Sequence, residues 1–290
     1  MTAITEHIPL NDKTFLRTGG RARYYCAVES VEDIVGCTEY SHKHNVPIFV
    51  LGYGSNSVMN DNGYMGLVVD CRRRFNCFRF EQELLIAQSG SSLMNIVCEA
   101  VGRGLSGVEA LGGIPGSIGG AVVMNAGAHG SEIGACVESV TCVDRHNGLM
   151  KTVPGSELQF SYRSSIIHQK PLIIVEVRLK LTPGNISSIK QTYTDLLNQR
   201  AAKQPLNKPS CGSVFKNPAH GSAGALIEQC GCKGMQIGGM MVSVKHANFI
   251  VNNGTGTSTH YHQLVFKVQK TVLEKTGILL EPEVEFVGDF

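Results

Sequence analysis

The chain has 290 residues, of which 42% are hydrophobic and 17% are charged, so it can bury substantial cores and is long enough for about two domains. Lysine and arginine total 26 against 24 acidic residues, and the formal net charge is +2. This balance excludes a broad cationic field for nucleic acid or acidic lipid, so any anion must be bound by local geometry.

The N-terminal segment and the cysteines bear on location. Residues 1–16 include Glu6, Asp12 and Lys13 and hold no continuous apolar stretch, so we expect no secretory signal. The longest apolar stretches are strand-sized and shorter than a membrane span. We therefore expect a cytoplasmic protein whose ten cysteines stay reduced, because disulfide frameworks are typical of short secreted domains. The spacing of Cys230 and Cys232 does not fit a zinc knuckle, so we expect no metal.

The first elements along the chain have a βαβ-like order. Tyr24–Val28 reads as a strand, and Val31–His44 has the apolar spacing of a helix. Two short apolar runs follow, Pro47–Leu51 and Leu67–Asp70, each bounded by glycine or asparagine. These runs predict buried strands.

A second group of elements follows. Leu84–Gln88 predicts a strand, and Ser92–Arg103 predicts a helix that begins at a serine cap and ends before Gly104. After a glycine-dense stretch, Val137–Asp144 and Leu172–Leu181 read as strands. The turn cluster Thr182-Pro183-Gly184-Asn185 then ends this first, larger region.

The remaining third of the chain predicts an α+β unit. Its expected helices are Ile186–Lys203, Ala223–Cys230 and Tyr261–Thr276, and its expected strands are Met241–Val244, Asn248–Val251 and Leu279–Val287. There is no internal repeat. Pattern and composition alone therefore predict a two-domain α+β or α/β protein.

A short glycine loop follows the strand that ends at residue 51. It consists of Gly52, Tyr53, Gly54, Ser55 and Asn56. Its backbone N–H groups can approach a phosphate without obstruction by side chains. The loop lacks the last glycine of a dinucleotide fingerprint and the lysine of a P-loop, so neither of those sites is indicated. By itself it is either a phosphate cradle or only a tight turn.

A second run is far denser in glycine. It comprises Gly112, Gly113, Ile114, Pro115, Gly116, Ser117, Ile118, Gly119 and Gly120, followed by Asn125, Ala126 and Gly127. Each glycine weakens a helix or strand by about 0.5–1 kcal/mol relative to alanine, which favours a large ligand against this backbone. A flexible loop is the alternative, but the isoleucines and the proline restrict the chain. We therefore predict cofactor binding.

In order and spacing, these motifs resemble the UDP-N-acetylenolpyruvoylglucosamine reductase family. The similarity covers nearly the whole chain and includes Thr14–Gly20, both glycine loops, the run that begins at Gly107, Phe160–Ser165, Pro209–Pro218, His246–Phe249 and Glu281–Val284. The length and the lack of an extra tyrosine-bearing insertion before residue 200 resemble the shorter, second type of the family.

The resemblance implies an α+β fold with a defined order of domains. A two-subdomain FAD-binding region of the vanillyl-alcohol-oxidase (PCMH) type would occupy residues 1–184, divided near residue 68. An α+β substrate-binding domain would follow over residues 185–279, with a C-terminal strand at 280–290. Neither glycine loop carries a histidine or cysteine for covalent attachment, so we expect FAD to bind noncovalently.

The activity implied is the NADPH-dependent reduction of UDP-N-acetylglucosamine enolpyruvate to UDP-N-acetylmuramate, a step of peptidoglycan precursor synthesis. We expect the protein to be a monomer. Three positions match the family's catalytic residues: Ser213 as proton donor, Arg163 for a carboxylate or enolate oxygen, and Glu283 as acid or hydrogen-bond partner. Without the resemblance, the same residues read as a turn serine, a solvated arginine and a surface carboxylate.

Other matched positions imply contacts with the substrate. They are Tyr162, Arg200, Lys203, Asn217, Gln229, His246 and Asn248. Two residues depart from the family pattern: Glu285 stands where an arginine is common, and Tyr53 stands where a small residue is common. The first departure puts in doubt a phosphate contact from the last strand.

Two rival functions remain open at this point. One is a flavin oxidase or dehydrogenase of the same fold that acts on a small alcohol or hydroxy acid; the Ser213 motif with Arg163 and Glu283 argues against it. The other is a nucleotide-binding module without catalysis, which predicts a colourless protein. Rapid flavin reduction by NADPH separates the reductase from both.

Overall fold

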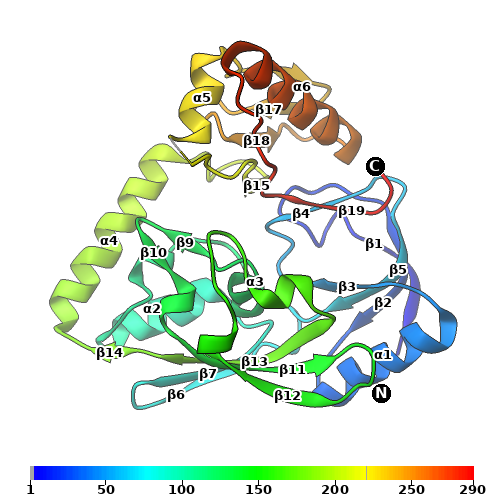
Figure 1. Cartoon of the computed structure of the whole chain (residues 1–290), viewed down its shortest axis with the longest axis vertical. Coiled ribbons are helices and arrows are strands. Elements are labelled where there is room, and N and C mark those ends of the chain that lie inside the picture. Colours follow the sequence, from blue (N-terminus) through cyan, green and yellow to red (C-terminus); the bar gives the residue numbers. More distant parts are fainter. Residues whose placement is uncertain (1–2, 220) are drawn as a thin grey trace. The chain divides into compact units, whose positions relative to one another are not determined.

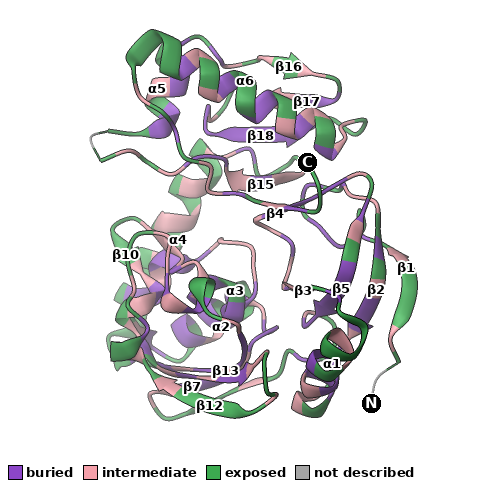
Figure 2. Ribbon diagram, turned by 45° about the vertical axis from the view of Figure 1, so that its right-hand side comes forward, coloured by how far each residue is buried: buried purple, intermediate pink, exposed green. Residues whose placement is uncertain are grey.

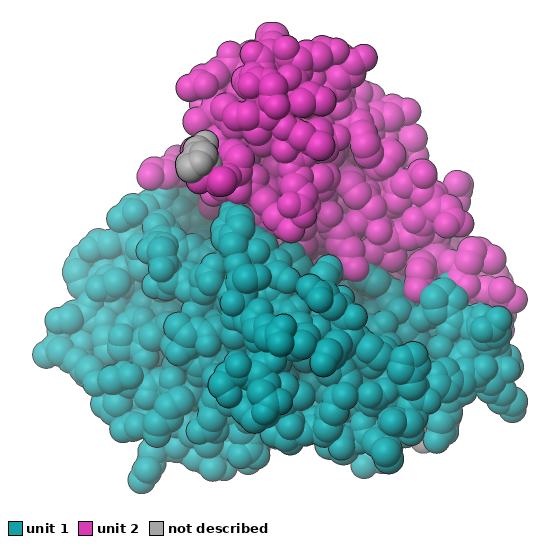
Figure 3. All heavy atoms as spheres, viewed as in Figure 1, with its two compact units in different colours: residues 1–5, 24–53, 66–200 teal, residues 6–23, 54–65, 201–290 magenta. Residues whose placement is uncertain are grey.

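The computed structural model describes residues 3–219 and 221–290, which form two compact units (Figures 1 and 3). Unit 1 comprises residues 1–5, 24–53 and 66–200, and unit 2 comprises residues 6–23, 54–65 and 201–290. This division follows spatial contacts, and the predicted domain boundaries at 184 and 279 stay predictions. The chain therefore passes between the units several times.

The first sheet has four strands in the order β1-β2-β5-β3. Its elements are β1 (Thr5–Pro9), β2 (Arg21–Ala27), β3 (Ile48–Leu51) and β5 (Tyr64–Asp70), with helix α1 (Val31–His44). Helix α1 covers the predicted residues. Its N-cap Ser30 accepts from the N–H of Asp33 at 3.2 Å, and Asn45 ends it in the left-handed conformation.

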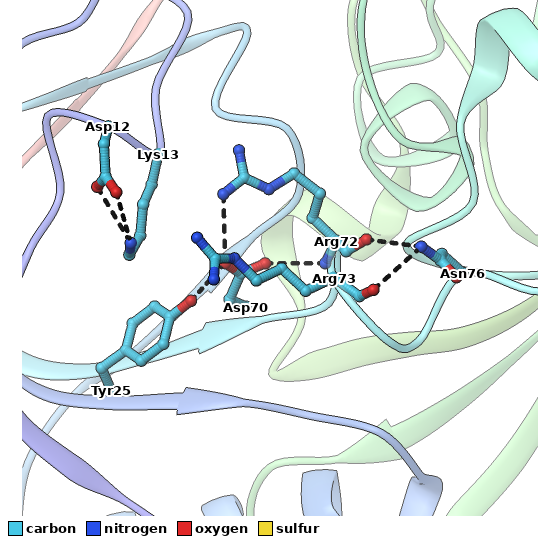
Figure 4. A network of polar contacts seen from close by, with 7 residues as sticks. All are labelled: Asp12, Lys13, Tyr25, Asp70, Arg72, Arg73 and Asn76. Carbon is cyan, nitrogen blue, oxygen red and sulfur yellow. Dashed lines mark hydrogen bonds and ion pairs between the residues drawn. The ribbon is translucent and has the colours of Figure 1, made fainter.

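A buried carboxylate closes the end of β5 (Figure 4). Asp70 is fully buried; it accepts from the Tyr25 hydroxyl at 2.6 Å and from the N–H of Arg72 at 2.8 Å. Burial and the bond to Asp70 raise the pKa of Tyr25. Asn76 donates to the Arg72 carbonyl. The charge is thus paired where the chain leaves the sheet.

The second sheet of unit 1 is antiparallel, in the order β12-β11-β13-β7-β6. Its strands are β6 (Phe78–Glu81), β7 (Leu84–Gln88), β11 (Val137–Asp144), β12 (Met150–Pro154) and β13 (Leu172–Lys180). Figure 1 shows helices α2 (Leu93–Gly102) and α3 (Ile118–Val123) over one face of this sheet. The sequence did not predict β6 or β12, because both are short edge strands with exposed residues and no buried apolar run.

Shorter elements complete unit 1. They are β8 (Leu105–Ser106) paired with β14 (Thr182–Pro183), β9 (Gly127–Ala128) paired with β10 (Ser131–Glu132), and the 3₁₀ helices η1 (Glu109–Leu111), η2 (Ile133–Ala135), η3 (Gly155–Glu157) and η4 (Ile166–Gln169). Helix α4 (Ile186–Lys203) also covers the predicted residues. Up to Arg200 it belongs to unit 1, because Ile189 is buried in the core under the second sheet and Tyr193 packs against that core.

Unit 2 is built on a four-stranded antiparallel sheet in the order β15-β18-β17-β16. Its elements are β15 (Ser210–Ser213), β16 (Gln236–Ile237), β17 (Met240–Val242), β18 (Phe249–Asn252), α5 (Ala223–Gln229) and α6 (Ser258–Thr276). Figure 2 shows β18 buried along its length. Helix α6 begins before the predicted Tyr261, because Thr257 caps it together with His260.

Two segments that are distant in sequence join in unit 2. Strand β4 (Ser57–Met59) pairs in parallel with β19 (Glu285–Val287), and Leu16 and Val58 are buried in the same core as α6. The predicted C-terminal strand over residues 279–287 is therefore shorter than expected. Proline at position 282 has no N–H to donate, which interrupts the ladder.

Two general properties follow from the structure. All ten cysteines carry free thiols in this structure. Within residues 3–219 and 221–290, no helix combines the length and apolar character needed to cross a membrane.

Candidate functional site

The first glycine loop has several open donors, by which we mean backbone N–H groups without a hydrogen-bond acceptor among the described residues. Among the described residues, no protein acceptor receives a hydrogen bond from the backbone N–H of Gly52, Tyr53, Gly54, Ser55 or Asn56. Gly54 has φ of +62°, and a Cβ there would lie 2.6 Å from the Lys13 carbonyl oxygen. Glycine is therefore required, and the loop is a built turn with its N–H groups left available.

The two glycine loops meet in unit 1. A Cβ on Gly52 would lie 2.4 Å from Ser117 Oγ, so the close approach of the loops excludes any side chain at position 52. In the second run, the N–H groups of Gly113, Gly116 and Ser117 likewise donate to no acceptor among the described residues. N–H groups without an acceptor thus occur in both loops, beside the close contact of Gly52 with the Ser117 side chain.

Most of the glycines in the second run have a structural cause. A Cβ on Gly112 would lie 2.5 Å from the Tyr193 ring, one on Gly113 would lie 2.9 Å from Arg200 Cδ, and one on Gly119 would lie 2.7 Å from Ser89 Cβ. Glycine density here reflects close packing by α4 and by the loop after β7. The density of glycine alone therefore does not indicate a ligand. The N–H groups without an acceptor are the independent observation that does.

The N-terminus of α3 is closed by the protein itself. The N–H of Ile118 donates to the Ser91 carbonyl, and that of Gly119 donates to the Ser89 carbonyl, both at 2.9 Å. Ser117 Oγ accepts from the N–H of Gly120 at 3.2 Å. The helix start thus has no spare donors over these residues, and the loop residues before it carry the open ones.

This donor set fits the pyrophosphate of FAD. A pyrophosphate needs several N–H donors and no obstructing Cβ, and both glycine loops supply them. Ile114, Pro115, Gly116 and Tyr53 are half-buried, so they offer apolar surface for a planar ring. Within unit 1, the residues that would hold FAD are Gly52, Tyr53 and the second glycine run; the cofactor contacts predicted for Gly54, Ser55 and Asn56, which belong to unit 2, stay predictions.

Asn125 organises the neighbourhood of Arg163. Asn125 is fully buried; its Nδ2 donates to Glu132 at 2.7 Å and to the Ser161 carbonyl at 2.9 Å, and its Oδ1 accepts from the N–H of Gly134. Its side chain is thus engaged within the protein. Asn125 is predicted to contact the cofactor. Its hydrogen bonds are those of a residue that positions the turn beginning at Ser161. The cofactor contacts predicted for Ala126 and Gly127 stay predictions.

Arg163 lies in a strained tight turn. Ser161 and Ser164 exchange backbone hydrogen bonds at 3.0 Å, and Arg163 between them has φ of +56°. This conformation costs a non-glycine residue about 1–3 kcal/mol and is typical of functional sites. The guanidinium donates to the Gly127 carbonyl at 3.0 Å and lies 4.9 Å from the centre of the exposed Tyr162 ring. Contacts within unit 1 therefore help to hold Arg163 in place.

The two predicted basic anchors on α4 differ in environment. Arg200 is half-buried against Gly113, and burial lowers the pKa of its guanidinium. Lys203 is exposed at the end of the helix. Both roles in substrate binding stay predictions.

In unit 2 the structure brings Ser213 next to Glu283. The N–H of Glu283 donates to the Val214 carbonyl at 2.8 Å, and Phe215 forms a bridge with Pro282. The segment that carries Ser213, the predicted proton donor, is therefore paired with the segment that carries Glu283, the predicted acid. Both residues are half-buried.

Asn248 supports the same segment from the other side. Its Oδ1 accepts from the N–H of Phe215 at 3.0 Å, its Nδ2 donates to the Phe215 carbonyl at 2.8 Å, and its backbone carbonyl accepts from Val214. These bonds give the buried Asn248 a positioning role. Its predicted contact with a substrate stays a prediction.

The other predicted substrate contacts lie around α5. Asn217 Oδ1 accepts from the N–H of Ala223 at 3.0 Å, and Gln229 is exposed at the end of α5. His246 packs edge-on against Phe249 at 4.9 Å between ring centres. Burial, and then the nearby Lys233, lower the pKa of His246, which disfavours its charged form. Its predicted contact with a substrate stays a prediction.

The sequence did not reveal several residues that contact the glycine run or join segments of unit 2. Tyr193 and Ser89 contact the glycine run, and Asn60 and Asp61 tie together segments of unit 2. The helical spacing that includes Tyr193 was visible, but its packing partner was not. No local signal identifies Asn60, because its partner is more than two hundred residues away in the chain.

Comparison with protein-family models covers both halves of the chain. A model of the UDP-N-acetylenolpyruvoylglucosamine reductase C-terminal domain matches residues 204–287, and a model of an FAD binding domain matches residues 22–153. Among solved structures, 6-hydroxy-D-nicotine oxidase from Arthrobacter nicotinovorans has a TM-score of 0.50 at 16% identity, covering 63% of this chain and 42% of that chain. This last likeness concerns the fold alone; together with the model of an FAD binding domain it confirms the predicted α+β fold with an FAD-binding region.

Full-length relatives are much closer. The chain is 42% identical over 287 residues to the UDP-N-acetylenolpyruvoylglucosamine reductase of Exiguobacterium sibiricum, covering 99% of the chain and 94% of the relative. It is 40% identical to the corresponding protein of Staphylococcus carnosus, covering 97% and 91%. The crystal structure of UDP-N-acetylenolpyruvylglucosamine reductase from Thermus caldophilus has a TM-score of 0.85 at 34% identity over 99% of both chains. This chain therefore belongs to the UDP-N-acetylenolpyruvoylglucosamine reductase family.

Proposed function

We propose that this protein reduces UDP-N-acetylglucosamine enolpyruvate to UDP-N-acetylmuramate with NADPH, through noncovalently bound FAD. Family membership over nearly the whole chain supports the reaction. The observation that carries the cofactor is the meeting of the two glycine loops at Gly52 and Ser117, beside N–H groups that have no acceptor in the described chain. We further propose that the reaction serves peptidoglycan synthesis in the cytoplasm, and so cell shape and division. A monomer stays a prediction.

The chemistry requires a hydride at one alkene carbon and a proton at its neighbour. Bound FAD supplies the hydride transfer from NADPH. Ser213 Oγ donates the proton to the neighbouring carbon. A serine hydroxyl is a weak acid, so Ser213 needs hydrogen-bonding neighbours as it gives up its proton. The adjoining backbone bond from Glu283 to Val214 supports this assignment, because it holds together the two segments that carry Ser213 and Glu283.

Two further residues stabilise the charge that develops on the enolate. The planar guanidinium of Arg163 suits a carboxylate or an enolate oxygen. Its strained turn is held by Asn125 and Ser164, so the group is positioned before substrate binds. Glu283 acts as acid or hydrogen-bond partner of the enolic intermediate, and it must be protonated if it donates.

Anaerobic absorbance measurements test the proposal. The purified protein should be yellow, NADPH should bleach the flavin, and addition of the enolpyruvyl sugar nucleotide should restore the oxidised spectrum without oxygen. A protein that stays colourless after refolding with FAD contradicts the proposed cofactor. A flavin that NADPH reduces but the sugar nucleotide does not reoxidise contradicts the proposed substrate.

A further inference from the structure

Two asparagines close the opposite ends of one strand pair in unit 2. Strands β4 and β19 run parallel, with Ser57 opposite Glu285 and Met59 opposite Val287. Asn56 precedes β4, and its Nδ2 donates to the Glu283 carbonyl at 3.0 Å. Asn60 follows β4, and its Nδ2 donates to the Asp289 carbonyl at 2.6 Å.

The backbone reinforces each asparagine at its own end. The carbonyl of Asn56 accepts from the N–H of Glu285, and the N–H of Asn60 donates to the Val287 carbonyl, both at 2.9 Å. Each asparagine therefore binds the C-terminal segment through both its side chain and its backbone. In both cases the side-chain amide donates to a carbonyl that lies outside the paired residues of β19.

The two ends differ in what they hold. Asn60 holds Asp289 in the exposed C-terminal tail. Asn56 holds Glu283, whose own N–H donates to the Val214 carbonyl directly after Ser213. The backbone N–H of Asn56, by contrast, is one of the open donors of the first glycine loop. Asn56, at the end of the first glycine loop, therefore binds the segment of Glu283, which in turn pairs with the segment of Ser213.

We propose that Asn56 is a positioning residue for the reduction of the substrate: its side-chain amide fixes the backbone of Glu283, and through Glu283 it fixes the position of Ser213. This inference rests on the proposed function, and it assigns to the Asn56 side chain a role other than the predicted contact with FAD. Asn56, Glu283 and Ser213 all belong to unit 2, so this positioning role is contained within one unit.

Isosteric variants at both asparagines test the inference in the FAD-loaded full chain. Asn56→Asp and Asn60→Asp each replace the amide donor with a carboxylate, which cannot donate to a carbonyl oxygen. Asn56→Leu and Asn60→Leu remove the donor without adding charge, which separates loss of the bond from repulsion of a phosphate. FAD content and the melting temperature of each variant are measured alongside the rates.

The two half-reactions are then followed separately. Loss of one positioning bond should slow flavin reoxidation by the enolpyruvyl sugar nucleotide between about tenfold and about a hundredfold in both Asn56 variants, with a much smaller change in flavin reduction by NADPH. The Asn60 variants should reoxidise at the rate of the unchanged protein. As pH falls, protonation of the carboxylate introduced by Asn56→Asp restores an O–H donor at this position. That variant should therefore regain rate relative to the unchanged protein at the same pH, whereas Asn56→Leu should not.

Three results would overturn the inference. The first is an equal loss in both half-reactions in the Asn56 variants, which would assign Asn56 to FAD binding or to folding. The second is a loss of the same size in the Asn60 variants, which would assign the effect to the strand pair as a whole. The third is an unchanged reoxidation rate in the Asn56 variants. Failure of the unchanged protein to complete either half-reaction instead contradicts the proposed function.

Discussion

At the scale of the residue, backbone contacts hold together the segments that carry Ser213 and Glu283, the proposed proton donor and the proposed acid. Ser213 and Glu283 are far apart in sequence, and the bond from Glu283 N–H to the Val214 carbonyl brings their segments together. Asn248 holds the same segment through both atoms of its amide group. These backbone and amide contacts fix the segments that carry Ser213 and Glu283.

Replacement of the proposed proton donor should separate the two half-reactions. We expect Ser213→Ala to keep flavin reduction by NADPH and to slow reoxidation by the enolpyruvyl sugar nucleotide by about 10²–10⁴-fold, the usual contribution of a general acid. Stopped-flow absorbance measures both steps. Ser210→Ala, on the same strand β15, is the matched control. Equal losses in both half-reactions of Ser213→Ala would remove Ser213 from its proposed role.

The glycines of the second run differ in what an added methyl group would meet. We expect Gly119→Ala to lower the free energy of unfolding by about 1–3 kcal/mol, because its Cβ would lie 2.7 Å from Ser89 Cβ. Gly102→Ala in α2 meets nothing within 4 Å and should raise it by about 0.5–1 kcal/mol. Chemical denaturation measures both. A Gly119→Ala protein as stable as the parent would contradict the claim that packing against Ser89 requires glycine at this position.

At the scale of the element, the start of α6 depends on a carboxylate from a distant segment. Asp61 accepts from the N–H groups of Ser258 and Thr259, both at 2.9 Å, and from the Thr259 hydroxyl at 2.8 Å. Burial alone would raise the pKa of Asp61, but these donors outweigh it and hold the pKa below its usual value. A negative charge also stabilises the positive end of the helix dipole.

The contribution of Asp61 to stability should vary with pH in a defined direction. Its pKa is lower in the folded chain than in the unfolded chain, so the stabilisation is present above about pH 4 and is lost as pH falls. We expect Asp61→Ala to cost about 1–2 kcal/mol at neutral pH, and the difference from the parent should shrink in acid. Asp195→Ala, exposed on α4, should cost less than about 0.5 kcal/mol. A difference that is independent of pH would contradict this account.

Elements with strong local signals could be predicted from the sequence. Helix α1 has a serine cap and an asparagine stop, and α4 follows an asparagine whose Oδ1 accepts from Ser188 N–H. Both helices cover the predicted residues. Strands β6 and β12 lack a buried apolar run, and β19 is cut short beside Pro282. Their pairing depends on long-range partners that no local pattern reveals.

At the scale of the whole molecule, the sequence predicted the family and the fold class but not the two units. Leu16 and Val58 lie in the core of unit 2, whereas Ile189 lies in a core of unit 1. Side-chain burial across distant segments decides this division. The chemistry of the site was predicted by resemblance. Local pattern could not predict that packing requires several of the glycines, or that Asn56 binds the segment of Glu283.

The central claim is that this chain reduces an enolpyruvyl sugar nucleotide with NADPH. The most direct test is the mass of the sugar nucleotide recovered after anaerobic incubation with the FAD-loaded protein and NADPH. The account predicts a product heavier by two hydrogen atoms, formed in proportion to the NADPH consumed. A sugar nucleotide of unchanged mass, or NADPH oxidation that occurs only when oxygen is admitted, would contradict it.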